Sequence, residues 1–191
     1  MPDERERLLE LTAHYLLENG VLDLSLRTLG EAIGSSHRVL LYYFDTREQL
    51  ITEALDHAAR LASVRDATLL GPSGTDPDVA RELVRVWRLV SADDQLPLIR
   101  LFLQVVALAL HDTGRYEAFL AGLMTEWSSA YAVYLRGHGL APDDAQEIAA
   151  EIVAMQRGLE LELAIGGSRD RVDRMFADAV ARWVDRVDAL T

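Results

Sequence analysis

The chain has 191 residues, half of them hydrophobic and none of them cysteine. This composition argues against an intrinsically disordered chain, and it excludes a disulfide framework and thiolate chemistry. The net charge of −12 disfavours non-specific DNA binding, which is mostly electrostatic. It still allows a protein that makes a small, well-placed set of contacts to nucleic acid.

Neither the N-terminal residues nor the most apolar stretch of the chain suggests export or membrane insertion. The first residues, Met1 to Glu6, are too acidic for the positively charged start of a signal peptide. The most apolar stretch, Leu96–Leu110, is interrupted by Arg100 and Gln104 and is too short to span a bilayer. We therefore expect a buried helix there, no membrane association and a cytoplasmic protein.

Apolar residues recur at three- and four-residue steps along nearly the whole chain, a period typical of amphipathic helices. The first helix is expected to begin after Asp3, and the N-cap candidates Ser25, Ser36 and Thr46 precede the next three. A Gly- and Pro-rich linker over 70–77 follows. Four or five further helices are expected near 77–91, 94–111, 114–137, 142–166 and 168–190. The sequence therefore predicts an all-α fold of about nine helices.

The segment Leu26–Phe44 has the pattern of a helix-turn-helix, which needs two short helices, a tight turn and an exposed face on the second helix. Gly34 can adopt the left-handed conformation that such a turn requires. Val39, Leu40 and Phe44 are expected to form the inward stripe of the second helix. An ordinary turn between two packed helices is the alternative interpretation.

The other side chains of this second helix suit contacts to DNA. Arg38 has paired donors that match the edge of guanine, and His37 can reach a base edge or a phosphate. The hydroxyl groups of Ser36, Tyr42 and Tyr43 can donate to phosphate oxygens. For each of these residues the alternative is an ordinary solvated side chain.

Residues 8–55 resemble the N-terminal three-helix DNA-binding domain of the TetR family of transcription regulators. The resemblance is carried by residues 29–50, LGEAIGSSHRVLLYYFDTREQL, which match that family's turn, recognition helix and start of the fourth helix. Two positions depart from the family: Leu41 replaces its usual tyrosine, and Arg47 replaces a lysine that contacts phosphate. The resemblance implies a helix-turn-helix DNA-binding domain over 1–46 and a ligand-binding and dimerisation domain over 47–191.

The pattern and the resemblance together give a set of DNA-binding residues. Arg27, near the first turn of the helix that precedes Gly34, can clamp a phosphate or remain solvated. The predicted set is Arg27, Thr28, Ser35, Ser36, His37, Arg38, Tyr42, Tyr43 and Arg47. The resemblance implies a ligand-responsive repressor that binds double-stranded DNA at a near-palindromic operator as a homodimer, with one recognition helix per subunit in successive major grooves.

The last two expected helices carry wide apolar stripes, which the resemblance assigns to a four-helix dimer interface. One stripe includes Val172 and Phe176, and the other includes Ile148 and Ile152. Packing within a single subunit is the alternative for both stripes.

In the TetR family a ligand pocket lies among helices four to eight. On the matching segments this chain has many apolar and aromatic side chains and few polar groups, which predicts a mostly apolar small-molecule effector of unknown identity. Plain packing in the core is the alternative for each residue. The predicted lining is Trp87, Phe102, Val106, His111, Phe119, Leu123, Trp127, Tyr131, Met155, Gln156 and Leu159.

Sequence motifs for catalysis are absent. The five histidines are scattered, and the sequence contains no glycine-rich phosphate loop, nucleophile elbow or zinc signature. We therefore predict no enzyme, no metal and no cofactor. Two alternatives to a repressor remain open: a helical small-molecule-binding or interaction protein of the same fold without significant DNA affinity, and an activator.

Overall fold

The computed structural model describes residues 3–61, 70 and 78–191, without the side chains of residues 123–127. Within these ranges the regular structure consists of nine α-helices and one 3-10 turn, and no strand occurs among them. The prediction of an all-α fold with about nine helices is therefore confirmed. The chain divides into two compact units, named here unit 1 (residues 1–65 and 97–120) and unit 2 (residues 66–96 and 121–191).

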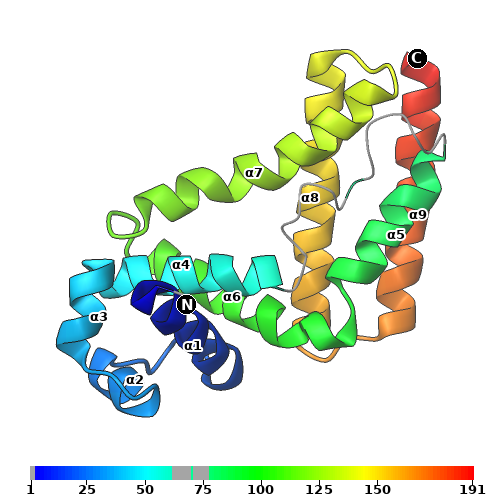
Figure 1. Cartoon of the computed structure of the whole chain (residues 1–191). Helices are drawn as coiled ribbons and strands as arrows, with labels where there is room; N and C mark the ends of the chain where they lie inside the picture. The colour runs from blue at the N-terminus through cyan, green and yellow to red at the C-terminus, as the bar shows by residue number, and fades with distance from the viewer. Residues whose placement is uncertain (1–2, 62–69, 71–77) are drawn as a thin grey trace. The chain divides into compact units, whose positions relative to one another are not determined.

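Unit 1 contains α1 to α4, almost all of α6 and the first residues of α7 (Figure 1). α1 packs along α4, and α3 packs against both α2 and α4. The side chains of Leu8, Leu29, Leu40 and Phe44 are fully buried in their shared core, so the two short helices rest on a longer helical support. The bounds are α1 Glu4–Asn19, α2 Leu26–Ala32, α3 His37–Phe44, α4 Arg47–Leu61 and α6 Leu96–His111.

Side-chain caps fix the starts of α2, α3 and α4 where the sequence predicted them. The hydroxyl oxygens of Ser25, Ser36 and Thr46 each accept a hydrogen bond from the backbone N–H three residues further on, at 3.0, 3.3 and 3.1 Å. Such caps satisfy N–H groups that the first turn of a helix leaves unpaired. Asp3 precedes α1 as expected, but its side chain makes no capping hydrogen bond.

α6 is the most apolar helix of the described chain. The stretch Asp93–His111 is long and apolar enough to cross a membrane by length and composition alone, with a mean hydropathy of 1.2. However, Leu101, Val105 and Ala109 are buried in the core of unit 1. The expected buried helix is therefore a core helix with one buried face, because Arg100 and much of the remaining surface stay exposed.

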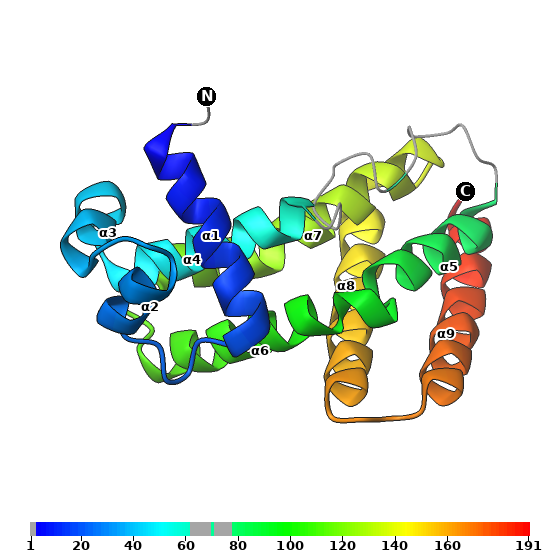
Figure 2. The ribbon, with the colours of Figure 1, turned by 60° about the horizontal axis from the view of Figure 1, so that its bottom comes forward.

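Unit 2 is built on α8 and α9, which run side by side in both ribbon views, and on α5, which packs along α9 (Figures 1 and 2). Trp87 of α5 stacks on Phe176 of α9 with ring centroids 4.8 Å apart, and its Nε1 donates to Asp173 Oδ1 at 2.8 Å. A satisfied indole N–H allows this large side chain to be buried. The bounds are α5 Val79–Val90, η1 Asp93–Gln95, α7 Glu117–Gly137, α8 Pro142–Ala164 and α9 Arg169–Leu190.

The two compact units divide the chain differently from the predicted functional domains. Unit 1 groups α4 and α6 with the first three helices, because α1 packs along α4 and the buried face of α6 completes the same core. The functional boundary between residues 46 and 47 stays a prediction. Apart from Leu70, the predicted linker over 70–77 lies outside the described residues.

Candidate nucleic-acid interface

Two glycines shape the turn between α2 and α3. Gly34 has a φ of 69°, the left-handed conformation expected of it. Gly30 lies so close to the start of α3 that a Cβ there would stand 3.1 Å from backbone atoms of Ser36. The Ser35 N–H also donates to the Gly30 carbonyl at 2.7 Å. The close approach at Gly30 was not predicted, although an isolated glycine inside a helical pattern is a signal of close packing.

α3 turns one face into unit 1 and leaves the other to solvent. Leu40 and Phe44 are fully buried, as predicted. Val39 was expected to point inward with them, but 37% of it is exposed. Successive residues are about 100° apart around a helix, so Val39 lies too far from the line through Leu40 and Phe44 to reach the core. The exposed residues of α3 are His37, Arg38, Val39, Leu41 and Tyr42.

Arg38 differs from the other arginines of the N-terminal helices. Arg5, Arg7, Arg27 and Arg47 each have a guanidinium nitrogen 2.5 to 3.8 Å from a carboxylate oxygen. Arg38 has neither an ion pair nor a hydrogen bond to any other described residue, and it is exposed on α3. Its guanidinium can therefore approach a phosphate or a guanine without first losing a protein contact.

Arg47 is placed differently from the phosphate-binding residue that the resemblance implied. Its Nε donates to the Leu24 carbonyl at 3.2 Å, and its Nη2 donates to the Val21 carbonyl at 3.3 Å. Only 26% of its side chain is exposed. These contacts direct the guanidinium into unit 1, where it ties the start of α4 to the loop between α1 and α2.

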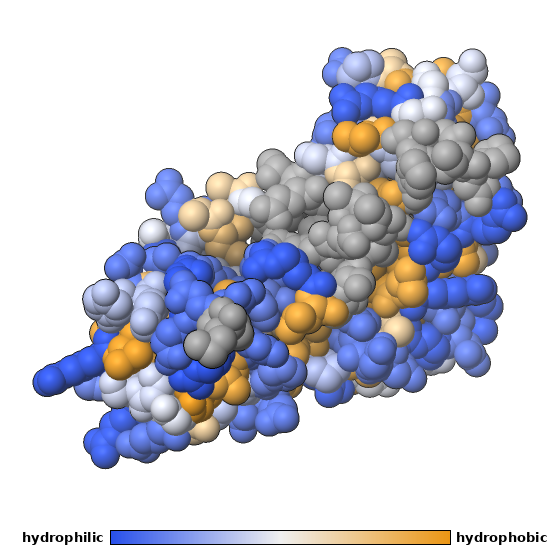
Figure 3. Space-filling view, in the orientation of Figure 1, coloured by the Kyte–Doolittle hydropathy of each residue, from blue (hydrophilic) through white to orange (hydrophobic). Residues whose placement is uncertain are grey.

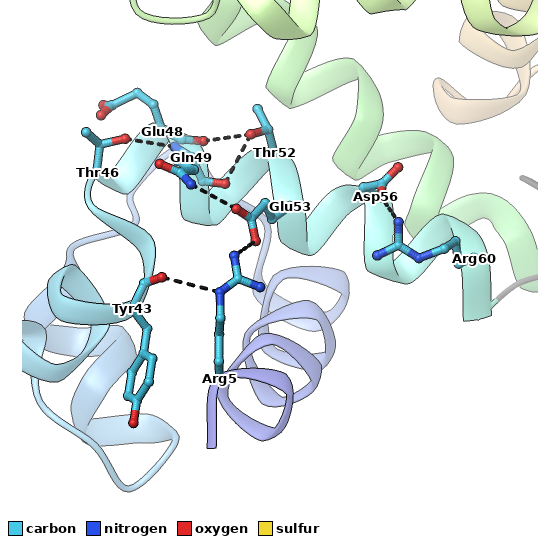
Figure 4. A network of polar contacts seen from close by, with 9 residues as sticks. All are labelled: Arg5, Tyr43, Thr46, Glu48, Gln49, Thr52, Glu53, Asp56 and Arg60. Carbon is cyan, nitrogen blue, oxygen red and sulfur yellow. Dashed lines mark hydrogen bonds and ion pairs between the residues drawn. The ribbon is translucent and has the colours of Figure 1, made fainter. Parts of the chain in front are cut away.

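Arg5 of α1 joins three helices, a contact that no sequence pattern suggested. Its Nη2 pairs with Glu53 of α4 at 2.5 Å, and its Nε donates to the Tyr43 carbonyl at 3.4 Å (Figure 4). Its guanidinium carbon also lies 4.8 Å from the centre of the Phe44 ring, a distance typical of a cation–π contact. The C-terminal end of α3 is therefore fixed to both α1 and α4.

The remaining predicted DNA-binding residues lie on or beside α2 and α3. The Thr28 hydroxyl shares a hydrogen bond of 2.7 Å with the serine that caps α2. The Ser36 hydroxyl is engaged as the α3 cap. The Arg27 side chain is 84% exposed and pairs with a glutamate one turn further on. Tyr43 is half-buried, with its ring edge-on to that of the exposed Tyr42 at 5.0 Å.

The predicted effector-pocket residues are divided between the two units. Phe102, Val106 and Phe119 are half-buried and His111 is exposed in unit 1, while Trp87 is committed to the stack between α5 and α9. Unit 2 also holds the buried Tyr131, Gln156 and Leu159 and the half-buried Met155, and Leu123 and Trp127 lie outside the described side chains.

Unit 2 contains buried polar groups on α7 and α8. The Gln156 side-chain amide donates to the Tyr131 hydroxyl at 2.7 Å, with both residues buried. One turn further along α8, Glu160 is only 4% exposed and pairs with Arg157 at 2.5 Å. Burial raises the pKa of the Glu160 carboxyl, and the nearby Arg157 opposes that shift. Such groups can give an apolar interior a few directional contacts to a ligand.

The stripes expected to form a dimer interface are in part buried within the single chain. Val172, Phe176, Ile148 and Ile152 are fully buried within one chain, so they form the core of unit 2. The outer side of α8 and α9 instead carries a groove of about 440 Å³. Its lining residues are Glu151, Ala154, Met155, Ala179, Arg182, Trp183 and Arg186.

Charge and apolar surface alternate along these two helices. Glu151 accepts hydrogen bonds from Arg186 at 2.6 Å and from Trp183 Nε1 at 2.9 Å. The bond from Arg186 is the main reason why the pKa of Glu151 is lowered. Leu161, Met175 and Leu190 are exposed apolar residues on the same helices, and the exposed Ile165 directly follows α8.

No group of three or more histidine, aspartate or glutamate side chains suited to a metal ion occurs among the described residues. The visible face of each unit is mostly hydrophilic, with apolar patches between the polar side chains (Figure 3). Among the described residues of unit 1, the exposed face of α3 carries the guanidinium of Arg38, without a described partner, beside apolar side chains.

Solved structures of transcription regulators share this architecture. A regulator from a Rhodococcus species is 17% identical, with a TM-score of 0.74 over 94% of this chain and 95% of that one. A TetR regulator from Haloarcula marismortui is 15% identical, with a TM-score of 0.67 over 97% of each chain. A candidate regulator from Saccharomonospora viridis, solved with choline, is 21% identical, with a TM-score of 0.71 over 93% of this chain and 95% of that one.

No protein-family model and no curated protein matches the chain. The structural similarities define the fold, which is that of helix-turn-helix transcription regulators. More particularly, the chain has the TetR-type fold, as the resemblance of residues 29–50 predicted.

Proposed function

We propose that the protein is a DNA-binding transcription regulator of the TetR type that acts as a ligand-responsive repressor. The observation that carries this proposal is the state of Arg38, which is exposed at the start of α3 without a described partner. The N-terminal part of a recognition helix is the part that meets base edges in the major groove. The fold shared with the solved regulators supports the same function. We propose that the protein acts in the cytoplasm by binding and is not an enzyme.

The proposed active form is a homodimer that places two copies of α3 on one near-palindromic operator. Two half-sites compensate for the small number of free cations among the described residues of α1 to α4, because both subunits bind the same DNA molecule. The occupant that we propose for the outer face of α8 and α9 is the same face of a second chain. Met175 and Ile165, which are 40% and 78% exposed, supply apolar surface for it.

Dimerisation is tested by sedimentation on the full chain. Ile165→Glu combined with Met175→Glu places charges on the proposed interface, and we expect the dimer dissociation constant to rise at least about 100-fold. Leu110→Glu on α6, where the leucine is 67% exposed, is the matched control and should leave the dimer intact. A wild-type protein that is monomeric at micromolar concentration would overturn the proposed assembly.

The proposed effector is a small molecule with a mostly apolar body, held partly by the buried polar groups of unit 2. The solved complex of a protein with the same fold and choline suggests a cationic ligand as the second candidate. Choline and an uncharged apolar compound of similar size are therefore the first two probes. The midpoint temperature of thermal unfolding of the full chain should rise when one of these two compounds is added, because a ligand that binds only the folded state stabilises that state.

DNA binding is tested by selecting duplexes from a random pool with the full chain and measuring affinity for the enriched sequence. Arg38→Ala should lower that affinity at least about 10-fold and relax the preference at one base position, as expected for loss of a guanine contact. Arg88→Ala, which removes an exposed arginine of α5, is the matched control and should bind like the wild type. Failure to enrich any duplex would favour the alternative, a small-molecule-binding or interaction protein without DNA affinity.

A further inference from the structure

The exposed face of α3 is unusually apolar for a surface that binds a polyanion. Tyr42 is 79% exposed, the largest value among the exposed large hydrophobic residues of the described chain. Leu41 is 39% exposed. In Figure 3 apolar patches lie beside hydrophilic side chains at the end of unit 1 that α3 forms. Apart from Arg38 and His37, this face offers hydrocarbon and a single phenol group.

Helix geometry groups these side chains around Arg38. Tyr42 lies one turn beyond Arg38 on the same ridge, since residues four apart are neighbours on a helix surface. Leu41 lies about 60° from Arg38 around the helix axis, because three steps of about 100° nearly complete a turn. The guanidinium of Arg38 is therefore flanked by an isobutyl group and an aromatic ring.

The charges of unit 1 indicate that this apolar surface has to contribute to binding. Arg5, Arg7, Arg27 and Arg47 already face carboxylates, and the chain as a whole carries a net charge of −12. Each phosphate that is neutralised contributes to affinity through counterion release. Because few cations are free among the described residues of unit 1, that electrostatic contribution is small, so base-edge contacts must supply a larger share of the binding energy.

We propose that Leu41, together with the ring of Tyr42, contacts the C5-methyl groups of thymines next to the base bound by Arg38. This inference rests on the proposed DNA-binding function and names the class of base that α3 recognises. Thymine is the one base of unmodified DNA that presents a methyl group in the major groove, and apolar side chains contact it there. A protein partner for the same face is the competing occupant, and the experiment separates the two.

The test compares two versions of the duplex selected with the full chain. One version contains thymine, and the other contains deoxyuridine at every thymine position, which deletes the methyl groups and keeps all hydrogen-bonding groups. Wild-type protein should bind the deoxyuridine duplex about four-fold more weakly for each buried methyl, the factor that corresponds to one apolar carbon leaving water. Leu41→Ala should bring the ratio of the two affinities closer to one, by about four-fold for each methyl that Leu41 covers.

The ratio of affinities is insensitive to the fraction of folded protein, because both duplexes are measured with the same sample. Leu61→Ala is the matched control, since this leucine is 58% exposed near the other end of α4, and it should keep the wild-type ratio. Equal wild-type affinity for the two duplexes overturns this inference alone. An unchanged ratio in Leu41→Ala also overturns it. If no duplex is enriched, both the proposed DNA-binding function and the thymine contact are overturned, and a protein partner becomes the occupant of the exposed face of α3.

Discussion

The side-chain oxygen of Gln104 on α6 accepts a hydrogen bond from the backbone N–H of Val21 at 2.8 Å. Val21 is fully buried and lies in the loop between α1 and α2. Carbonyls of the same loop accept the hydrogen bonds from Arg47 on α4. The chain segment that leads into the helix-turn-helix is therefore fastened by one side chain from α6 and one from α4.

Replacing Gln104 tests the first of these fastenings. Gln104→Leu keeps most of the volume but leaves the Val21 N–H without an acceptor, and an unsatisfied buried polar group costs about 1–3 kcal/mol. We expect the free energy of unfolding in urea to fall by that amount. Gln49→Leu removes an exposed bond to a glutamate on α4 and should change stability by less than about 0.5 kcal/mol. Equal losses in the two variants would show that the contact with Val21 is not special.

Arg47 and Arg38 should separate stability from DNA affinity. Arg47→Ala removes two charge-assisted bonds to part-buried backbone carbonyls and should lower the free energy of unfolding by about 1.5–3 kcal/mol. Because its guanidinium points into unit 1, the slope of DNA affinity against salt should stay close to that of the wild type. Arg38→Ala should unfold like the wild type and lose affinity instead. A reduced salt slope in Arg47→Ala would restore the phosphate contact that the family resemblance implied.

Gly30 provides a test of the crossing between α2 and α3. In Gly30→Ala the added Cβ would stand 3.1 Å from the Ser36 backbone, so α3 must shift and DNA affinity should fall by at least about 10-fold. Gly158→Ala is the matched control, since nothing lies within 4 Å of a Cβ at that position in α8. Alanine favours a helix over glycine by up to about 1 kcal/mol, so this variant should melt higher and bind DNA normally. Normal DNA binding by Gly30→Ala would mean that the turn tolerates a wider crossing.

Glu160 should give unit 2 an unusual dependence on pH. Its folded-state pKa is raised above the ordinary value of 4.5 by burial, so its contribution to stability is present below that value and is lost as the pH rises through the raised pKa. Glu160→Gln should therefore be at least as stable as the wild type at pH 7. Its advantage should shrink as the pH falls toward 4.5. Urea unfolding at a series of pH values measures this difference.

Glu151 supplies the control of opposite sign for this pH series. Its folded-state pKa is lowered, chiefly by the hydrogen bond from Arg186, so its contribution is present above 4.5 and is lost as the pH falls. Glu151→Gln should therefore be less stable than the wild type at pH 7, with a difference that vanishes in acid. Parallel pH profiles for the two variants would contradict the assignment of Glu160 as a carboxyl destabilised by burial.

Local patterns predicted the helices and caps well because they depend on neighbours in the sequence. Ser25, Ser36 and Thr46 cap helices by bonding to backbone three residues away, a relationship that can be read from the chain itself. The left-handed Gly34 follows for the same reason. The outward position of Val39 was missed because adjacent helix residues point about 100° apart, so Val39 and Leu40 cannot both face the core.

Long-range contacts could not be predicted from a single sequence. Arg5 reaches Glu53 and Gln104 reaches Val21 across 48 and 83 positions of chain, and no periodicity relates such residues. The inward turn of Arg47 depends on where the α1–α2 loop places its carbonyls, which only the fold determines. The dimer interface stays a prediction, because a helix with core on one side and a partner on another shows a single broad apolar pattern.

The placement of Trp87 in unit 2, where it stacks on Phe176, has a practical consequence for spectroscopy. All three tryptophans, Trp87, Trp127 and Trp183, belong to unit 2, so indole emission is a reporter confined to that unit. A dye attached near α3 is needed to follow the helix-turn-helix, because the tyrosines are divided between the two units. Recording both signals during one denaturation would show whether the two units melt as one or as separate cooperative blocks.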